Sequence, residues 1–235
     1  MKRLTLIACV GLLCGLGMET FAIPIAQWTF EVNTPADLTD SSGITGIAAD
    51  VGNGTASGFH ASSATDWTTP AGNGSANSLN ANNWAVGDYF QFRVSTLGYQ
   101  GITVSWDQAG SSTGPRDFVL QYSIDGTSFT QVGSSYQASL SDWVAGTFHA
   151  GFTFSPSLTG IESAIANQPN VYFRLTDNST TSIGGGTVAG GGTERVDNFT
   201  VSGNALPESS PGLLGWICIL AMLLCSRRCL RSFAG

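Results

Sequence analysis

Apolar and polar residues alternate along seven short segments in the middle of the chain. These segments are 26–32, 89–94, 102–106, 118–123, 148–154, 171–176 and 195–201. Alternation at every second position puts one set of side chains on one face, which is typical of a half-buried β-strand. Asp125-Gly126 stands between two such runs, where a hairpin turn would join them. The pattern predicts an all-β fold, an antiparallel β-sandwich of the jelly-roll type.

Three other stretches depart from the alternation. Residues 158–167 are compatible with a helical turn, whereas 41–58 and 182–192 are rich in glycine and are predicted to be long flexible loops. Trp28 and Trp106 lie within alternating segments, so we expect both indoles in the core.

The N-terminal end carries a continuous apolar run instead of an alternating one. Lys2 and Arg3 precede the apolar residues 4–16, and Thr20-Phe21-Ala22 follows with small residues at the positions that a signal peptidase reads. We therefore predict a signal peptide over 1–22, a β-sandwich ectodomain over 23–205 and a separate C-terminal segment over 206–235. A first transmembrane helix is the alternative, but the apolar run is short for one.

The C-terminal segment combines a Pro-Glu pair, an apolar run and a basic cluster. Pro207 and Glu208 precede the apolar residues 212–225, and a cluster of three arginines follows, namely Arg227, Arg228 and Arg231. A bilayer requires about 20 apolar residues in a helix, so this run predicts one short transmembrane helix. The arginines should stay on the cytoplasmic side and leave the ectodomain outside.

This order of features resembles the PEP-CTERM sorting signal, which an exosortase-type membrane enzyme reads. Pro207, Glu208, Arg227 and Arg228 match that signal, whereas Ser209 replaces its second proline. The resemblance implies an exosortase-type processing partner, transient anchorage in the membrane, and a final location in the cell envelope or outside the cell. A simple membrane anchor is the alternative, and a sortase signal of the Leu-Pro-x-Thr-Gly type fits less well.

Charge and cysteine content exclude several functions for the ectodomain. Residues 23–206 contain 14 Asp or Glu against four Arg and no Lys, a formal difference of −10. Such a surface offers no basic footprint for a phosphate backbone, so nucleic acid is excluded as a partner. Without lysine, Schiff-base chemistry and Lys–Asn crosslinks inside the ectodomain are also excluded. All five cysteines lie in the two end segments, so no disulfide supports the sandwich.

Two parts of the ectodomain resemble carbohydrate-binding jelly rolls of exported bacterial proteins. They are residues 106–129, with Trp106-Asp107-Gln108 and the Asp125-Gly126 turn, and the ending Arg195-Val196-Asp197-Asn198-Phe199. The resemblance implies polysaccharide as a partner and a structural calcium ion near the strand ends.

Only Glu31 and Asp197 of this chain match the position of that calcium site in the resembling domains. The first and last strands of a jelly roll commonly pair, which would bring these two carboxylates together, and hard oxygen ligands are what Ca²⁺ requires. Asp50 could add a ligand from its loop. The alternative is that both are solvated or hydrogen-bonded carboxylates at strand ends.

Trp67 and Trp84 lie in polar surroundings between the predicted strands. An exposed indole there would be a platform for stacking on a sugar face. The alternative is that each ring folds back and caps the core.

The expected function is that of a non-enzymatic surface or extracellular-matrix protein that binds polysaccharide or is embedded in it. The competing hypothesis is a secreted glycoside or ester hydrolase. Fourteen acidic residues offer many carboxylate pairs, and residues 110–114 match a nucleophile elbow around Ser112, but a proline and another strand follow it instead of a helix. His60 and His149 are the only histidines, and no compact catalytic constellation appears in the sequence.

Overall fold

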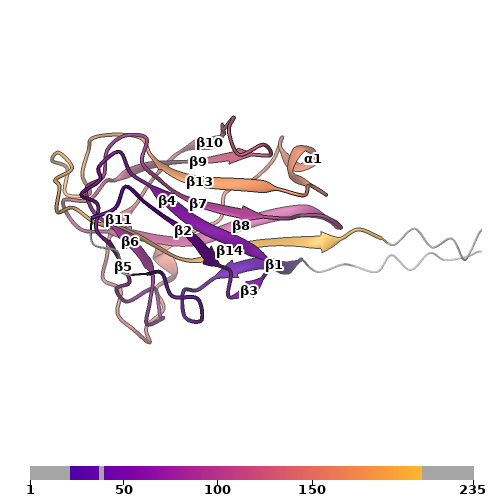
Figure 1. Ribbon diagram of the computed structural model, residues 1–235, viewed down its shortest axis with the longest axis horizontal. Helices are drawn as coiled ribbons and strands as arrows, with labels where there is room; N and C mark the ends of the chain where they lie inside the picture. Colours follow the sequence, from indigo (N-terminus) through magenta and orange to yellow (C-terminus); the bar gives the residue numbers. More distant parts are fainter. Residues whose placement is uncertain (1–21, 37–39, 208–235) are drawn as a thin grey trace, which may run out of the picture. The chain divides into compact units, whose positions relative to one another are not determined.

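Two sheets, antiparallel apart from one short parallel pair at an edge of the first, pack face to face in the computed structural model, which describes residues 22–36 and 40–207 (Figure 1). Sheet A has the order β11 (Ser139–Leu140), β8 (Tyr99–Gly110), β14 (Glu194–Ala205), β1 (Ile23–Trp28) and β3 (Val51–Gly52). Three short strands are added to it: β12 (Thr153–Phe154) pairs with β8, β6 (Leu79–Ala81) pairs with β14, and β5 (Trp67–Thr68) pairs with β6. Sheet B has the order β10 (Thr130–Gln137), β9 (Asp117–Ser123), β13 (Val171–Asp177), β7 (Tyr89–Val94), β4 (Gly54–Phe59) and β2 (Gly43–Ala48). The predicted all-β antiparallel sandwich is confirmed.

Aromatic rings from both sheets form the centre of the core. Phe199 of β14 stacks face to face on Phe92 of β7, with ring centroids 3.6 Å apart and planes 3° from parallel. Trp28 of β1 meets Phe92 edge-on at 5.2 Å, and Trp106 of β8 lies 6.1 Å from Phe199. Trp28 and Trp106 are buried as predicted, at 0% and 1% exposure.

Several predicted elements are confirmed at or near their expected bounds. β7 coincides with the segment 89–94, β13 extends 171–176 by one residue, and β9 and β10 form the hairpin around Asp125-Gly126. The first and last strands pair, with Trp28 opposite Phe199. The helical turn appears as α1 (Glu162–Ile165), and 182–192 contains no strand.

The predicted loop over 41–58 is wrong, because β2, β3 and most of β4 lie within it. Its glycines make room for tryptophan rings: a Cβ on Gly54 would stand 2.6 Å from the Trp28 ring, and one on Gly58 would stand 2.3 Å from the Trp67 ring. The glycines therefore mark close approach of large side chains to the strand and not flexibility.

The predicted strand over 148–154 is also largely wrong. Residues Ala150–Phe152 form a 3₁₀ turn, η1, and only Thr153–Phe154 pair as the short strand β12.

The signal peptide and nearly all of the sorting segment lie outside the described residues. This applies to residues 1–21, to Glu208, and to Arg227, Arg228 and Arg231. Within 22–36 and 40–207, no helix has the length and apolar character needed to cross a membrane.

Candidate functional site

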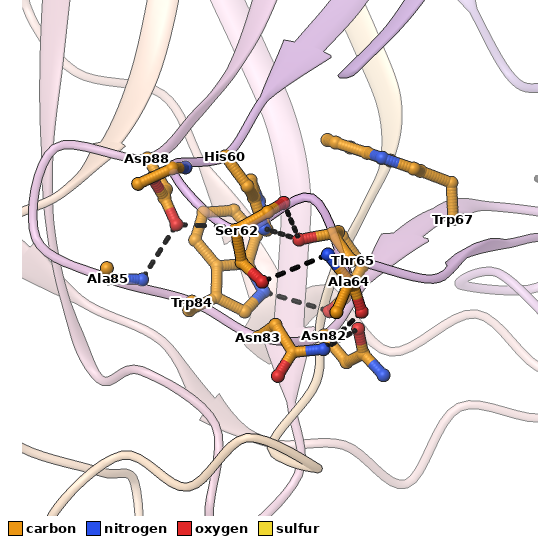
Figure 2. Close-up of polar contacts among 12 residues, drawn as sticks. His60, Ser62, Ala64, Thr65, Trp67, Asn82, Asn83, Trp84, Ala85 and Asp88 are labelled. Carbon is orange, nitrogen blue, oxygen red and sulfur yellow. Dashed lines mark hydrogen bonds and ion pairs between the residues drawn. The ribbon is translucent and has the colours of Figure 1, made fainter. Parts of the chain in front are cut away.

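Both tryptophans predicted as sugar platforms belong to the interior. Trp67 is 0% exposed and Trp84 is 6% exposed. Figure 2 shows their rings near the His60 ring, and the centroid distances are 4.8 Å for Trp67 and 4.2 Å for Trp84. Each indole N–H is already satisfied at 2.8 Å, by the carbonyl of Ser41 and of Ala81 respectively. The stacking prediction is therefore wrong, because these rings are covered by the protein itself.

His60 is a buried structural residue at the centre of this cluster. Its side chain is 0% exposed, and burial lowers its pKa to about 4. Its Nδ1 lies 3.2 Å from the Thr65 hydroxyl and 3.7 Å from Asp88 Oδ2 (Figure 2). Asp88 also accepts hydrogen bonds from the backbone N–H groups of Ala61 and Ala85. The imidazole is therefore neutral near pH 7, and its contact with Asp88 is not an ion pair.

Ser112, the centre of the nucleophile-elbow match, lines a cavity of about 550 Å³ together with Ser111, Ser141 and Arg195. Neither His60 nor His149 is among the described residues that line this cavity. Nucleophilic activation of a serine requires an adjacent base, so the geometry gives Ser112 no support as a catalytic residue.

The structure brings Glu31 and Asp197 to one loop, residues 72–78. Glu31 Oε1 accepts the backbone N–H of Asn77 at 2.7 Å, and Asp197 Oδ2 accepts the N–H of Asn73 at 2.8 Å and the hydroxyl of Ser75 at 2.6 Å. Asp50 bonds elsewhere, to the backbone of Thr29, Glu31 and Asn33. The described residues contain no group of three or more His, Cys, Asp or Glu side chains that could hold a metal ion. Calcium at Glu31 and Asp197 stays a prediction, in which the ion would compete with these N–H donors.

A calcium ion at Glu31 and Asp197 should make the melting temperature sensitive to chelation. An ion that binds only the folded state stabilises it by mass action, so EDTA should lower the melting temperature and Glu31→Ala should remove that effect. Differential scanning fluorimetry of the full chain, with Asp142→Ala as the control for loss of an exposed carboxylate, measures both. Equal melting with and without EDTA would eliminate the ion.

Four carboxyl groups are buried with raised pKa values, and one of them is Asp88 beside His60. Burial, with a smaller contribution from Asp107, raises the pKa of Asp197 to about 7. Burial, with a contribution from Asp88, raises the pKa of Asp177 to about 7. Burial also raises the pKa of Glu194 well above its ordinary value. Each charged form is disfavoured because the interior solvates an ion poorly.

Acidification from pH 8 to 6.5 should stabilise the fold. A carboxyl group whose pKa is raised in the folded chain keeps its proton at a pH where the unfolded chain has released it. Its contribution to the free energy of unfolding is therefore complete below the unfolded pKa and is lost as the pH rises through 7. His60 acts in the opposite direction, but only below its unfolded pKa of 6.5. In buffer with EDTA, which keeps calcium from Asp197, we expect about 1 kcal/mol from each of Asp177 and Asp197 over this interval.

Asp177→Asn should therefore remove about half of this pH dependence, while Asp66→Asn, a control carboxyl, should leave it unchanged. Urea unfolding at the two pH values measures the effect. An unfolding free energy that stays level or rises toward pH 8 in the unmodified chain would contradict the buried-carboxyl explanation.

The side of sheet B that faces away from the core presents three rows of side chains, which we call the outer face. Residues paired across neighbouring strands point to the same side of a sheet, so the register of β4, β7, β13 and β9 defines the rows. The rows are Phe59, Tyr89, Thr176 and Val119; Ser57, Gln91, Arg174 and Gln121; and Thr55, Arg93, Tyr172 and Ser123. The two β9 residues at the row ends, Val119 and Ser123, are buried.

Aromatic rings on the outer face are accessible to solvent. Phe59 is 46% exposed, and its ring lies 5.8 Å from that of the half-buried Tyr89, with an angle of 31° between the planes. The Arg174 guanidinium lies over the rings of Tyr89 and Phe129, with its carbon 3.7 Å and 3.5 Å from their centroids. The tilted pair and the stacked guanidinium form a surface that crosses three strands and the β9–β10 hairpin.

Hydrogen bonds fix the polar side chains of the middle row. Arg174 Nε donates to Gln91 Oε1 at 2.8 Å, and Arg174 Nη2 donates to the Tyr89 hydroxyl at 3.0 Å. Gln91 Nε2 donates to the Ser57 hydroxyl at 3.3 Å, and the Thr176 hydroxyl donates to Gln121 Oε1 at 2.9 Å. These side chains are therefore held in place before any ligand arrives, which lowers the entropy cost of binding.

A small cavity of about 220 Å³ adjoins the third row. Asn53, Thr55, Arg93 and Asn170 provide its polar lining. Asn170 Oδ1 accepts hydrogen bonds from Arg93 Nε at 2.9 Å and from Arg93 Nη2 at 2.6 Å. The outer face thus combines exposed aromatic rings, amides, hydroxyls and two guanidinium groups. That combination suits a sugar, whose C–H face stacks on a ring while its hydroxyls bond to polar groups.

Sequence reasoning missed this face because it considered only tryptophans as platforms. Tyr89, Gln91 and Arg93 occupy the polar positions of a correctly predicted strand, and Tyr172 and Arg174 do so in another. Aromatic residues at the polar positions of alternating strands were the available signal.

No family model matches the chain, and no curated protein sequence matches it. Among solved structures, the CBM22-1 xylan-binding domain of Paenibacillus barcinonensis Xyn10C has 11% identity and a TM-score of 0.44, over 80% of this chain and 98% of that one. TmCBM61 in complex with β-1,4-galactotriose has 12% identity and a TM-score of 0.38, over 74% and 92%. The K1 cleaved adhesin domain of Lys-gingipain from Porphyromonas gingivalis has 12% identity and a TM-score of 0.37, over 60% and 84%.

Proposed function

We propose that this chain is an exported surface protein whose sandwich binds polysaccharide on the outer face of sheet B. The observation that carries the proposal is the contact of the exposed Phe59 with the half-buried Tyr89 beside the fixed polar row of Gln91 and Arg174. Large apolar rings on the solvent side of a sheet lower the solubility of a protein. A ligand that covers these rings would explain why they lie there. A site on the face of a sheet suits a polymer better than a small molecule, which usually occupies a concave pocket.

A binding role fits this face better than hydrolysis. Glycoside hydrolysis in most enzymes requires two carboxyl groups on either side of the bond that is cut. The side chains of the three rows contain no carboxylate. The hydrolase alternative would therefore need a different location on the sandwich.

Removal of an outer-face ring should weaken glycan binding. Tyr89→Ala and Phe59→Ala should each lower the affinity by up to about tenfold, the upper range for one aromatic contact. Affinity electrophoresis against neutral and acidic polysaccharides, followed by calorimetry on the best ligand, measures the change. Phe148→Ala is the matched control, since Phe148 is 61% exposed but lies outside sheet B. Absence of binding to every polysaccharide, or equal losses in Tyr89→Ala and Phe148→Ala, would disprove the proposal.

Export and sorting form the second part of the proposal, which the terminal sequences support. The signal peptide over 1–22 would direct export, and an exosortase-type enzyme would read Pro207 and Glu208 while the apolar run holds the chain in the membrane. The arginine cluster would stop the chain from passing through, because charged side chains are costly to move across the bilayer.

Processing at the tail should be visible in the mass of the mature protein. We expect a species from the native host that lacks residues 212–235 and appears in the envelope or the medium. Pro207→Ala combined with Glu208→Ala should block cleavage and leave a full-length membrane form, whereas Ser209→Ala serves as the neighbouring control. A wild-type species that still ends at Gly235 would indicate an ordinary anchor.

A further inference from the structure

Two arginines of the outer face have no carboxylate partner within the part of the chain that the structure describes. Of the four arginines between residues 22 and 207, Arg116 alone forms an ion pair within the described residues, with its Nη2 3.0 Å from Asp117 Oδ2. Arg93 and Arg174 bond only to neutral groups there, namely Asn170, Gln91 and the Tyr89 hydroxyl. This is unexpected in a chain whose ectodomain has more than three acidic residues for each arginine.

The two arginines lie on adjacent strands of sheet B. Arg93 pairs in register with Tyr172, and Arg174 pairs with Gln91, so the two arginines are diagonal on adjacent strands. Diagonal positions are separated by about 7–8 Å, within reach of long side chains. Their side chains reach different partners, Arg93 toward Asn170 and Arg174 toward Gln91 and Tyr89, so the two positive charges lie at separate points of the outer face.

Both guanidinium groups retain unused donors. Each has five N–H groups. In Arg174 the Nε and Nη2 atoms are bonded, and in Arg93 the same two atoms are bonded, so Nη1 has no hydrogen-bond partner among the described residues in either case. Arg93 also lines the cavity of about 220 Å³, whose polar lining of Asn53, Thr55 and Asn170 is uncharged. The face therefore offers positive charge and free N–H groups to an acceptor that comes from outside.

We infer that the polysaccharide bound by the outer face is acidic and carries carboxylate groups that Arg93 and Arg174 recognise. The inference rests on the proposed function and names the ligand class of the same site. A carboxylate accepts two parallel N–H bonds from a guanidinium group, and such charge-assisted bonds are about twice as strong as neutral ones. Tyr89 and Phe59 would stack on the sugar rings, while the two arginines would select the acidic polymer over a neutral one.

Because the chain is negatively charged, the two arginines can favour an acidic polymer only at short range. The acidic residues elsewhere repel an acidic polymer at long range, but this repulsion is screened beyond about 8 Å at physiological ionic strength. Contact with the two arginines acts within that distance. The affinity for an acidic glycan should therefore depend on these two side chains far more than on the net charge.

Matched polymers test the inference directly. The full chain is titrated with polygalacturonate and alginate and with the esterified form of each, which has the same backbone but neutral carboxyl groups. We expect each acid form to bind at least about tenfold more tightly than its ester, as for loss of a charged hydrogen bond. Arg93→Gln and Arg174→Gln should each lose about tenfold on the acid form and little on the ester.

Controls separate charge from geometry and from folding. Arg116→Gln removes a charge that Asp117 already neutralises and should leave the affinity unchanged. Arg93→Lys keeps the charge without the bidentate fork and should recover only part of the affinity. Arg93 is exposed, so its variants should keep the wild-type melting temperature even if Arg174→Gln lowers it.

The possible failures are distinguishable. Equal affinity for acid and ester, preference for a neutral glycan, or equal losses in Arg93→Gln and Arg116→Gln would overturn the acidic ligand and leave polysaccharide binding in place. Sulfated dextran that binds more tightly than both polyuronates would also overturn it, because the anion would then be a sulfate ester. Absence of binding to all of these polymers and to neutral glycans would overturn the proposed function itself.

Discussion

Phe199 and Phe92 join the two sheets, and much of the molecule depends on that contact. Phe199 lies face to face on Phe92 and also meets Trp28, Trp106 and Phe173 within 6.3 Å. Phe92 is the inward member of an alternating strand, so its neighbours Gln91 and Arg93 must point outward. The core contact thus determines which side chains of β7 reach solvent. A shift of one residue in this strand would bury the polar row and expose the phenylalanines.

The strands that could be predicted are those whose two faces differ strongly in polarity. Residues 89–94 and 171–176 alternate without interruption, and both were found with correct or nearly correct bounds. Residues 54–59 were not predicted as a strand, because Gly54 and Gly58 stand where apolar side chains would otherwise mark the inward face. Their partners are the rings of Trp28 and Trp67, which lie elsewhere in the chain, so a local pattern cannot reveal them. The segment 148–154 alternates too, yet only its last two residues pair with β8.

The proposed binding face was harder to predict than the fold. Trp67 and Trp84 stand in polar sequence, but their position in the interior depends on His60 and on segments that close over them. Tyr89 and Arg174 are 85 residues apart and meet only through the register of β7 with β13. Their individual outward positions could be inferred from alternation, whereas their contact could not. The proximity of Glu31 and Asp197 was easier to predict, because the first and last strands of a jelly roll commonly pair. β1 and β14 do so here.

The pairing of β1 with β14 gives the domain two very different mechanical responses. Ile23 lies opposite Gly203, so the two ends of the domain leave the β1–β14 pair at the same edge. A force that pulls these ends apart therefore breaks the hydrogen bonds between β1 and β14 one after another. A force that enters at the C-terminal end of β14 and leaves through a ligand on sheet B acts along the strand instead. β14 is bonded to β8 on one side and to β1 and β6 on the other, so many bonds share that load in shear. Under the proposed function, a domain held by its C-terminal strand alone would therefore resist drag on the bound polysaccharide.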